Sequence, residues 1–180
     1  MCAPGSGLVT FTLAKKMKSK IVATILSLLS FTPLIAENLP QALIVKTPET
    51  WKVEHQGDNG IEFYTVTRKE GDTALLMFSR WPVAGNINQI PEQIEKLAKG
   101  FVAQAKGNKE LKLKTTKYEV EKIEGDTFSG NFVRFEIEGG FTQTMFMIGD
   151  DQGIWNGQFT GTKERWTEAL SILKKLKKKG

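Results

Sequence analysis

The chain has 180 residues and a formal net charge of +5, from 25 Lys or Arg and 20 Asp or Glu side chains. Four lysines precede residue 37 and five lie in residues 174–179, so residues 37–173 hold 16 basic and 20 acidic side chains, a net charge of −4. A nucleic-acid-binding protein depends on a basic face, and this slightly acidic body argues against a nucleic-acid partner.

The N-terminal segment is typical of a secretory signal peptide. Lys18 and Lys20 form a basic start, residues 21–35 are mainly apolar, and Ala36 is a small residue suited to cleavage. The apolar run is about fifteen residues long, shorter than the roughly 20 needed to span a bilayer. We therefore expect cleavage near Ala36, with an uncleaved signal anchor as the alternative. Met17 opens the signal sequence and is a candidate for the true start of the chain.

Export would leave one mature domain, residues 37–180, in the periplasm or outside the cell. Cys2 is the only cysteine, and it falls in residues 1–36, which we expect to be removed. The mature domain would then contain no disulfide, no thiolate nucleophile and no cysteine metal ligand. No cysteine follows the apolar run, so a lipid-modified cysteine is not available at that site.

The first part of this domain is expected to form strands. Trp51 begins the first strand, which ends before Asn59-Gly60, a dipeptide that favours a two-residue hairpin turn. The next strand is 61–68. After a turn at 69–72, the nearly continuous apolar sequence of 73–78 predicts a strand that is covered on both faces.

An amphipathic helix is expected from about Asn88, where the apolar period changes. Gly107-Asn108 ends the helix, and Gly100 within it is expected to allow close packing against the sheet. The buried stripe is predicted to comprise Ile90, Ile94, Leu97, Phe101 and Ala105.

The second half of the domain predicts an antiparallel meander and a second helix. Residues 111–123 are highly charged and alternate weakly, which indicates a long strand or hairpin near a sheet edge. Gly139-Gly140 supplies a tight turn in the meander, and the alternation before it indicates a sheet packed on one side. Three strands are expected at 132–138, 141–148 and 154–160. A final helix opens at Thr162, and its apolar stripe comprises Trp166, Ala169, Leu170, Leu173 and Leu176.

These elements predict an α+β domain, an antiparallel sheet of about six to seven strands packed between amphipathic helices. The chain carries Pro-x-x-Trp-Lys-Val at 48–53 and closes on a strand, a Gly-Thr pair and a helix. In these features it resembles the Mog1/PsbP-like superfamily, and within it the exported bacterial DcrB-like proteins. The resemblance covers about Ala42 to Lys178. It implies an α/β/α sandwich that works as an accessory or binding protein. DcrB-like proteins often carry a lipid-attachment cysteine, which this sequence lacks.

Few residues could support catalysis. His55 is the only histidine, and its place near a turn predicts a surface or capping role. No Gly-x-Ser-x-Gly elbow supplies a nucleophile for it, and one histidine without a mature cysteine is too little for a zinc centre. Glu136 and Glu138 have a spacing that a glycosidase pair could use, although a solvated strand face explains them better. We therefore expect no catalytic, metal-binding or cofactor-binding residues and no cofactor.

Two features remain as candidate contact sites. Trp81 and Pro82 lie on a loop, where they could contact a partner or could cover the edge of the sheet. The lysines expected at the C-terminal end of the last helix could contact an anionic membrane surface. Alternatively, they are solvated at a helix end whose dipole favours positive charge. These lysines are Lys174, Lys175, Lys177, Lys178 and Lys179.

The sequence thus favours an exported, non-enzymatic binding or accessory protein of the bacterial cell envelope, with a protein or another envelope component as its partner. The first alternative is a membrane-surface protein, retained by an uncleaved signal anchor or by the C-terminal lysines. The second alternative is a hydrolase that uses carboxylates in a cleft. Such an enzyme would require a concave pocket with two or more acids of raised pKa.

Overall fold

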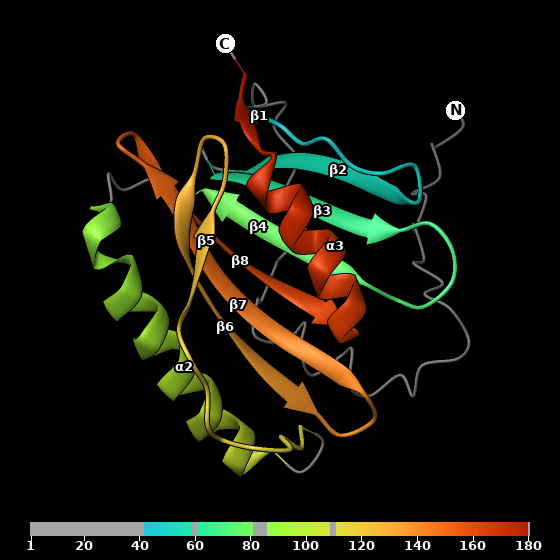
Figure 1. Ribbon diagram of the computed structural model, residues 1–180, viewed down its shortest axis with the longest axis vertical. Helices are drawn as coiled ribbons and strands as arrows, with labels where there is room; N and C mark the ends of the chain where they lie inside the picture. The colour runs from blue at the N-terminus through green and yellow to red at the C-terminus, as the bar shows by residue number, and fades with distance from the viewer. Residues whose placement is uncertain (1–41, 59–60, 81–85, 109–110, 180) are drawn as a thin grey trace, which may run out of the picture. The chain divides into compact units, whose positions relative to one another are not determined.

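Seven strands form one antiparallel sheet in the computed structural model, which describes residues 42–58, 61–80, 86–108 and 111–179 (Figure 1). All of these residues belong to one compact unit, Pro33–Gly180. The spatial order is β2-β3-β4-β8-β7-β6-β5. The strands are β2 (Trp51–Asp58), β3 (Ile61–Arg68), β4 (Leu75–Arg80), β5 (Glu121–Glu124), β6 (Ser129–Ile137), β7 (Phe141–Asp150) and β8 (Gly153–Gly161). The prediction of an antiparallel sheet of about six to seven strands is confirmed.

Short turns set the register of the meander. Gly139 and Gly140, between β6 and β7, have φ angles of 95° and 86°, which residues with a side chain rarely adopt. Between β7 and β8, Asp150 pairs with Gly153 across a two-residue turn. β8 then lies between β7 and β4, so that the last strand of the meander joins the two halves of the sheet.

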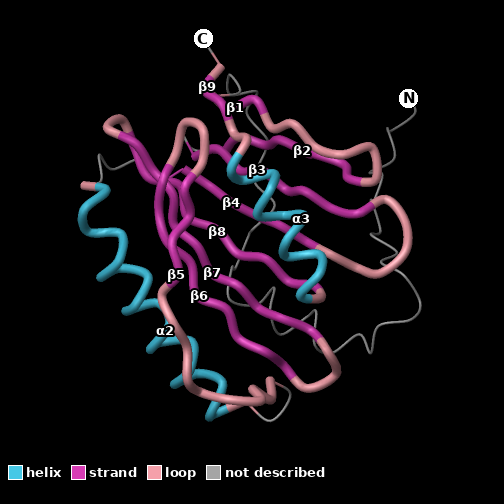
Figure 2. The backbone as a smooth tube through the Cα atoms, viewed as in Figure 1, coloured by secondary structure: helices cyan, strands magenta, loops and turns pink. Residues whose placement is uncertain are grey.

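Two helices pack on opposite faces of the sheet (Figures 1 and 2). A short 3₁₀ turn, η1 (Ile87–Gln89), leads into α2 (Ile90–Gly107), and α3 (Lys163–Lys174) follows β8. Phe132 and Val133 are neighbours in β6 and point to opposite faces; Phe132 packs in the core under α3 and Val133 in the core under α2. The sheet thus lies between the two helices, as the overall fold prediction states, and the expectation that the meander packs on one side only is wrong.

The buried stripe of α2 differs from the predicted one at a single position. Leu97 is 41% exposed, and Ala98 is fully buried in its place. At about 100° per residue around the helix axis, Leu97 lies roughly 60° from the centre of the observed buried stripe, whereas Ala98 lies roughly 40° from it. Gly100 is exposed, and a Cβ at this position would meet no atom within 4 Å. The expected close packing of Gly100 against the sheet is therefore wrong.

The last helix begins as predicted and ends earlier. The Thr162 side chain accepts a hydrogen bond from the Arg165 backbone N–H, which caps the first turn. Ile172 is fully buried, whereas Leu170 is only partly buried. The helix ends at Lys174, and the chain continues into a short strand, β9 (Lys177–Lys178). This strand pairs with β1 (Leu43–Ile44) in a separate two-stranded sheet.

Two strand predictions need correction. Within 111–123, regular pairing in the main sheet is confined to β5, which is an edge strand as expected. Leu113 forms only an isolated bridge with Ile137. In β4, alternate residues are fully buried under α3, while Leu75 and Met77 on the other face are only partly buried, so the strand is not fully covered on both faces as predicted.

No helix among the described residues is both long enough and apolar enough to cross a bilayer.

Candidate functional site

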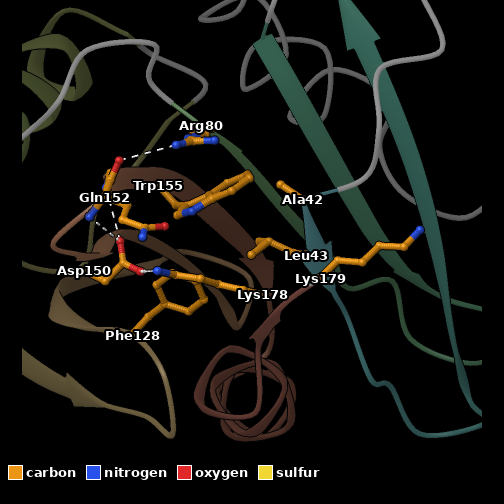
Figure 3. Close-up of a pocket in the computed structure, with 10 residues that line it drawn as sticks. Ala42, Leu43, Arg80, Phe128, Asp150, Gln152, Trp155, Lys178 and Lys179 are labelled. Atoms are coloured by element: carbon orange, nitrogen blue, oxygen red, sulfur yellow. Dashed lines mark hydrogen bonds and ion pairs between the residues drawn. The ribbon is translucent and has the colours of Figure 1, made fainter.

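A pocket of about 210 Å³ lies where the two ends of the described chain meet the turn between β7 and β8 (Figure 3). Trp155, Phe128 and Leu43 give it apolar walls, and each of these side chains is at least 97% buried. Charged side chains of Arg80, Asp150 and Lys178 surround the walls. The described residues that line the pocket are Ala42, Leu43, Arg80, Phe128, Asp150, Gln152, Gly153, Trp155, Lys178 and Lys179.

Strands β1 and β9 form one side of the pocket. Leu43 pairs with Lys178 and Ile44 with Lys177, and the Lys179 backbone N–H donates to the Ala42 carbonyl at 2.8 Å. This terminal clasp, β1 paired with β9, joins residues that are about 135 positions apart in the chain. Because Leu43 and Leu176 are both fully buried, the clasp is anchored in the core under α3.

Two side chains of β3 hold the clasp to the main sheet. Glu62 Oε2 accepts a hydrogen bond from the Ala42 backbone N–H at 3.2 Å, and the Tyr64 hydroxyl accepts one from the Leu43 N–H at 3.0 Å. The Tyr64 hydroxyl in turn donates to Glu62 Oε2 at 3.1 Å. Burial raises the pKa of Tyr64 above its ordinary value, and the charge of Glu62 adds to this effect.

His55 belongs to the same group. It lies opposite Tyr64 in the register of β2 and β3, and its ring centroid is 4.8 Å from that of Tyr64. His55 Nε2 is buried without a hydrogen bond and lies 3.8 Å from Glu62 Oε2. The predicted surface or capping role is wrong, because strand pairing turns this side chain toward the core under α3.

Asp150 links the turn between β7 and β8 to the terminal clasp. Its Oδ1 accepts hydrogen bonds from the backbone N–H groups of Gln152 and Gly153, at 2.9 and 3.1 Å, and its Oδ2 lies 2.5 Å from Lys178 Nζ. Burial alone would raise the pKa of Asp150, but the Lys178 ammonium and the two N–H groups outweigh it and hold the pKa below its ordinary value. Asp151 lies 3.8 Å from the same ammonium with 87% of its side chain exposed, so it contributes little.

Arg80 is one of two charged lining groups that have no carboxylate partner among the described residues; the other is the exposed Lys179. Arg80 Nη2 donates to the Gln152 carbonyl at 3.3 Å, and a Cβ added at Gly153 would lie 3.3 Å from Arg80 Nε. The guanidinium therefore packs closely over the Gly153 backbone. The other three arginines of the chain each pair with a carboxylate. Trp155, the cross-strand neighbour of Arg80, forms no hydrogen bond with the other lining residues (Figure 3).

The structure brings together only part of what the sequence singled out. Trp81 and Pro82 lie outside the described residues, so their role stays a prediction. Lys174 is in the last turn of α3, but Lys177 and Lys178 form β9. The prediction that all five lysines lie at the C-terminal end of the last helix is therefore wrong for the lysines after Lys175. Lys178 and Lys179 line the pocket, whereas the exposed Lys174, Lys175 and Lys177 do not.

Sequence reasoning missed Arg80, Trp155 and Asp150 as members of one site. Asp150 falls between the strands expected at 141–148 and 154–160, and Trp155 falls within the second of these, so neither residue stands out. The one sequence feature that could have indicated this site is Arg80, because it is a charged residue at the end of an otherwise mainly apolar strand. The remaining contacts depend on the pairing of β4 with β8 and of β1 with β9, which no local pattern specifies.

The carboxylate pair considered for hydrolysis has lysine partners. Glu136 lies 3.4 Å from Lys114, and Glu138 lies 3.6 Å from Lys112. These pairs fit the solvated strand face that we considered the better explanation. Within the described residues, no group of three or more His, Cys, Asp or Glu side chains is arranged to hold a metal ion.

Comparison of the sequence with models of protein families and with curated proteins finds no match.

Proposed function

We propose that this chain is an exported, non-enzymatic binding or accessory protein of the bacterial cell envelope, and that it contacts its partner through the pocket beside the terminal clasp. The observation that carries the proposal is the combination of apolar walls with Arg80, a cation that has no carboxylate partner among the described residues. Apolar walls with a few fixed polar groups are the usual composition of a binding site. The signal sequence expected before Ala36 supports export, and it lies outside the described residues.

Among the described lining residues there is one carboxylate, Asp150, and the pKa of that group is lowered. A hydrolase of the kind considered from the sequence would use two or more acids, at least one with a raised pKa. The geometry therefore supports recognition better than carboxylate catalysis at this position.

Site-specific crosslinking in the envelope tests the proposal. Gln152 is exposed and lines the pocket, so a photoreactive residue placed there should capture a partner. The matched control is Lys177, an exposed residue of β9 that does not line the pocket. Intact-mass analysis of the exported chain should show loss of the residues through about Ala36. Capture of nothing at Gln152, or equal capture at Lys177, would contradict the proposed role of the pocket.

A membrane-surface role is the second candidate. Lys174, Lys175, Lys177 and Lys179 are exposed, and none has a carboxylate partner among the described residues. Vesicles with anionic lipid should then bind the wild type better than a variant with these four lysines changed to Gln, and added salt should remove the difference. Equal binding of the two proteins at low salt would eliminate this candidate.

A further inference from the structure

We propose that the pocket beside the terminal clasp recognises a single carboxylate attached to an apolar group, such as the C-terminal residue of a polypeptide, with Arg80 as the anion-binding residue. This inference rests on the proposed function and adds the chemical class of the bound group. Three features of the pocket carry it: its hydrogen-bond donors, its charge balance and its size.

The pocket contains donors for which the described part of the chain supplies no acceptor. An arginine side chain has five N–H donors, and Arg80 makes one hydrogen bond to the described residues, to the Gln152 carbonyl. The indole N–H of Trp155 forms none with the other lining residues, and Figure 3 shows its nitrogen at the end of the ring that faces the turn with Asp150 and Gln152. Two donors from adjacent strands can thus converge on one acceptor group.

The charge balance of the pocket favours a monoanion. The Lys178 ammonium is matched by Asp150 at 2.5 Å, and the Lys179 side chain runs away from the other lining residues (Figure 3). Within the described part of the pocket, Arg80 therefore leaves about one positive charge without a partner. A carboxylate supplies one negative charge, whereas a phosphate group carries up to two, which this single positive charge would not balance. A carboxylate also fits the planar fork of a guanidinium.

The volume and the walls define what can be attached to the carboxylate. A volume of about 210 Å³ is below the roughly 300 Å³ at which sites for drug-sized ligands begin. The pocket can therefore take one small group rather than a large molecule. Leu43, Phe128 and Trp155 are apolar walls, so an aliphatic side chain next to the carboxylate would be removed from water there.

Titration of the Trp155 indole resonance in ¹⁵N-labelled full-length mature protein tests the inference. The probes are N-acetyl-L-leucine, its uncharged analogue N-acetyl-L-leucinamide, and inorganic phosphate. N-acetyl-L-leucine should shift this resonance saturably, and the other two should bind at least about tenfold more weakly, the factor expected for loss of a charged hydrogen bond. Trp155→Phe assigns the resonance.

Two variants and one control variant test whether N-acetyl-L-leucine binds in the pocket. Arg80→Gln should weaken binding of N-acetyl-L-leucine about tenfold. Gly153→Ala keeps the charge but places a Cβ 3.3 Å from Arg80 Nε, and it should also weaken binding by displacing the guanidinium. Lys177→Gln removes an exposed charge from β9 outside the pocket and should leave binding unchanged. Urea unfolding of each variant establishes that it is folded.

The outcomes separate this inference from the proposed function. No saturable shift with N-acetyl-L-leucine, equal binding of the amide, or binding unaffected by Arg80→Gln in a folded protein would overturn the carboxylate site. Equal or tighter binding of phosphate would overturn the choice of a carboxylate. In each case, crosslinking from Gln152 could still capture a partner, and the proposed function would stand.

Discussion

Removal of one hydroxyl group, in Tyr64→Phe, should loosen the terminal clasp beside the pocket. The Tyr64 hydroxyl accepts the Leu43 backbone N–H and donates to Glu62. Tyr64 and Leu43 are at least 99% buried, and Glu62 is 8% exposed. A phenylalanine ring would fill the same space, so the change would remove two hydrogen bonds without creating a large cavity.

The expected loss follows from these contacts. A buried N–H that loses its acceptor costs about 1–3 kcal/mol. Glu62 keeps the Ala42 N–H as a donor, so loss of the second hydrogen bond adds about 0.5–1 kcal/mol. The free energy of unfolding should therefore fall by about 1.5–4 kcal/mol. The loss is limited by the free energy that holds β1 in place, because a larger penalty would be avoided by detachment of β1. Burial of the Leu43 side chain contributes about 1.5–3 kcal/mol to that free energy.

Urea unfolding measures the global loss, and amide hydrogen exchange measures the local one. The Lys179 N–H donates to the Ala42 carbonyl across the clasp, so its exchange should be faster in Tyr64→Phe. Tyr118→Phe is the matched control, because Tyr118 is the only other tyrosine and its hydroxyl has no hydrogen-bond partner among the described residues. A loss below about 0.5 kcal/mol in Tyr64→Phe, with unchanged exchange at Lys179, would refute the anchoring role of this hydroxyl.

Three further outcomes are expected. Gly100→Ala should raise the free energy of unfolding by about 1 kcal/mol, because its Cβ meets open space and alanine is the better helix former; a destabilised variant in urea unfolding would contradict this. The lowered pKa of Asp150 means that its pairing with Lys178 stabilises the fold above the ordinary aspartate pKa of about 3.9 and is lost as the pH falls through the lower pKa of the folded state. Stability measured between about pH 5 and pH 2 should thus fall more steeply in the wild type than in Asp150→Asn, and parallel curves would exclude this contribution. Glu168→Ala should cost about 1–3 kcal/mol in thermal or urea unfolding, because the buried Trp51 indole N–H donates to Glu168 at 2.8 Å and would lose its acceptor; unchanged stability would show that this hydrogen bond contributes nothing.

Two predictions about the helices show which structural features a local sequence pattern can specify. Thr162 was expected to cap α3 and does so, because a cap depends on residues within one turn. Leu97 was expected to be buried and is not. The centre of the buried stripe of α2 is set by how the helix sits on β6 and β7, and the apolar spacing of the helix alone permits either Leu97 or Ala98 to face the sheet.

Local sequence patterns were enough to predict the type of most elements, since the alternation of strands, the period of helices and the Gly139-Gly140 turn are local properties. The candidate site, in contrast, depends on contacts between distant parts of the chain. Asp150 meets Lys178 because a short strand after α3 pairs with one near residue 43, and Arg80 meets Trp155 because β8 lies beside β4. Strand order and register are fixed by burial of side chains on both faces of the whole sheet, a condition that involves residues far apart in the chain. For this reason the same sequence that predicts the strands does not reveal which polar side chains their ends bring together.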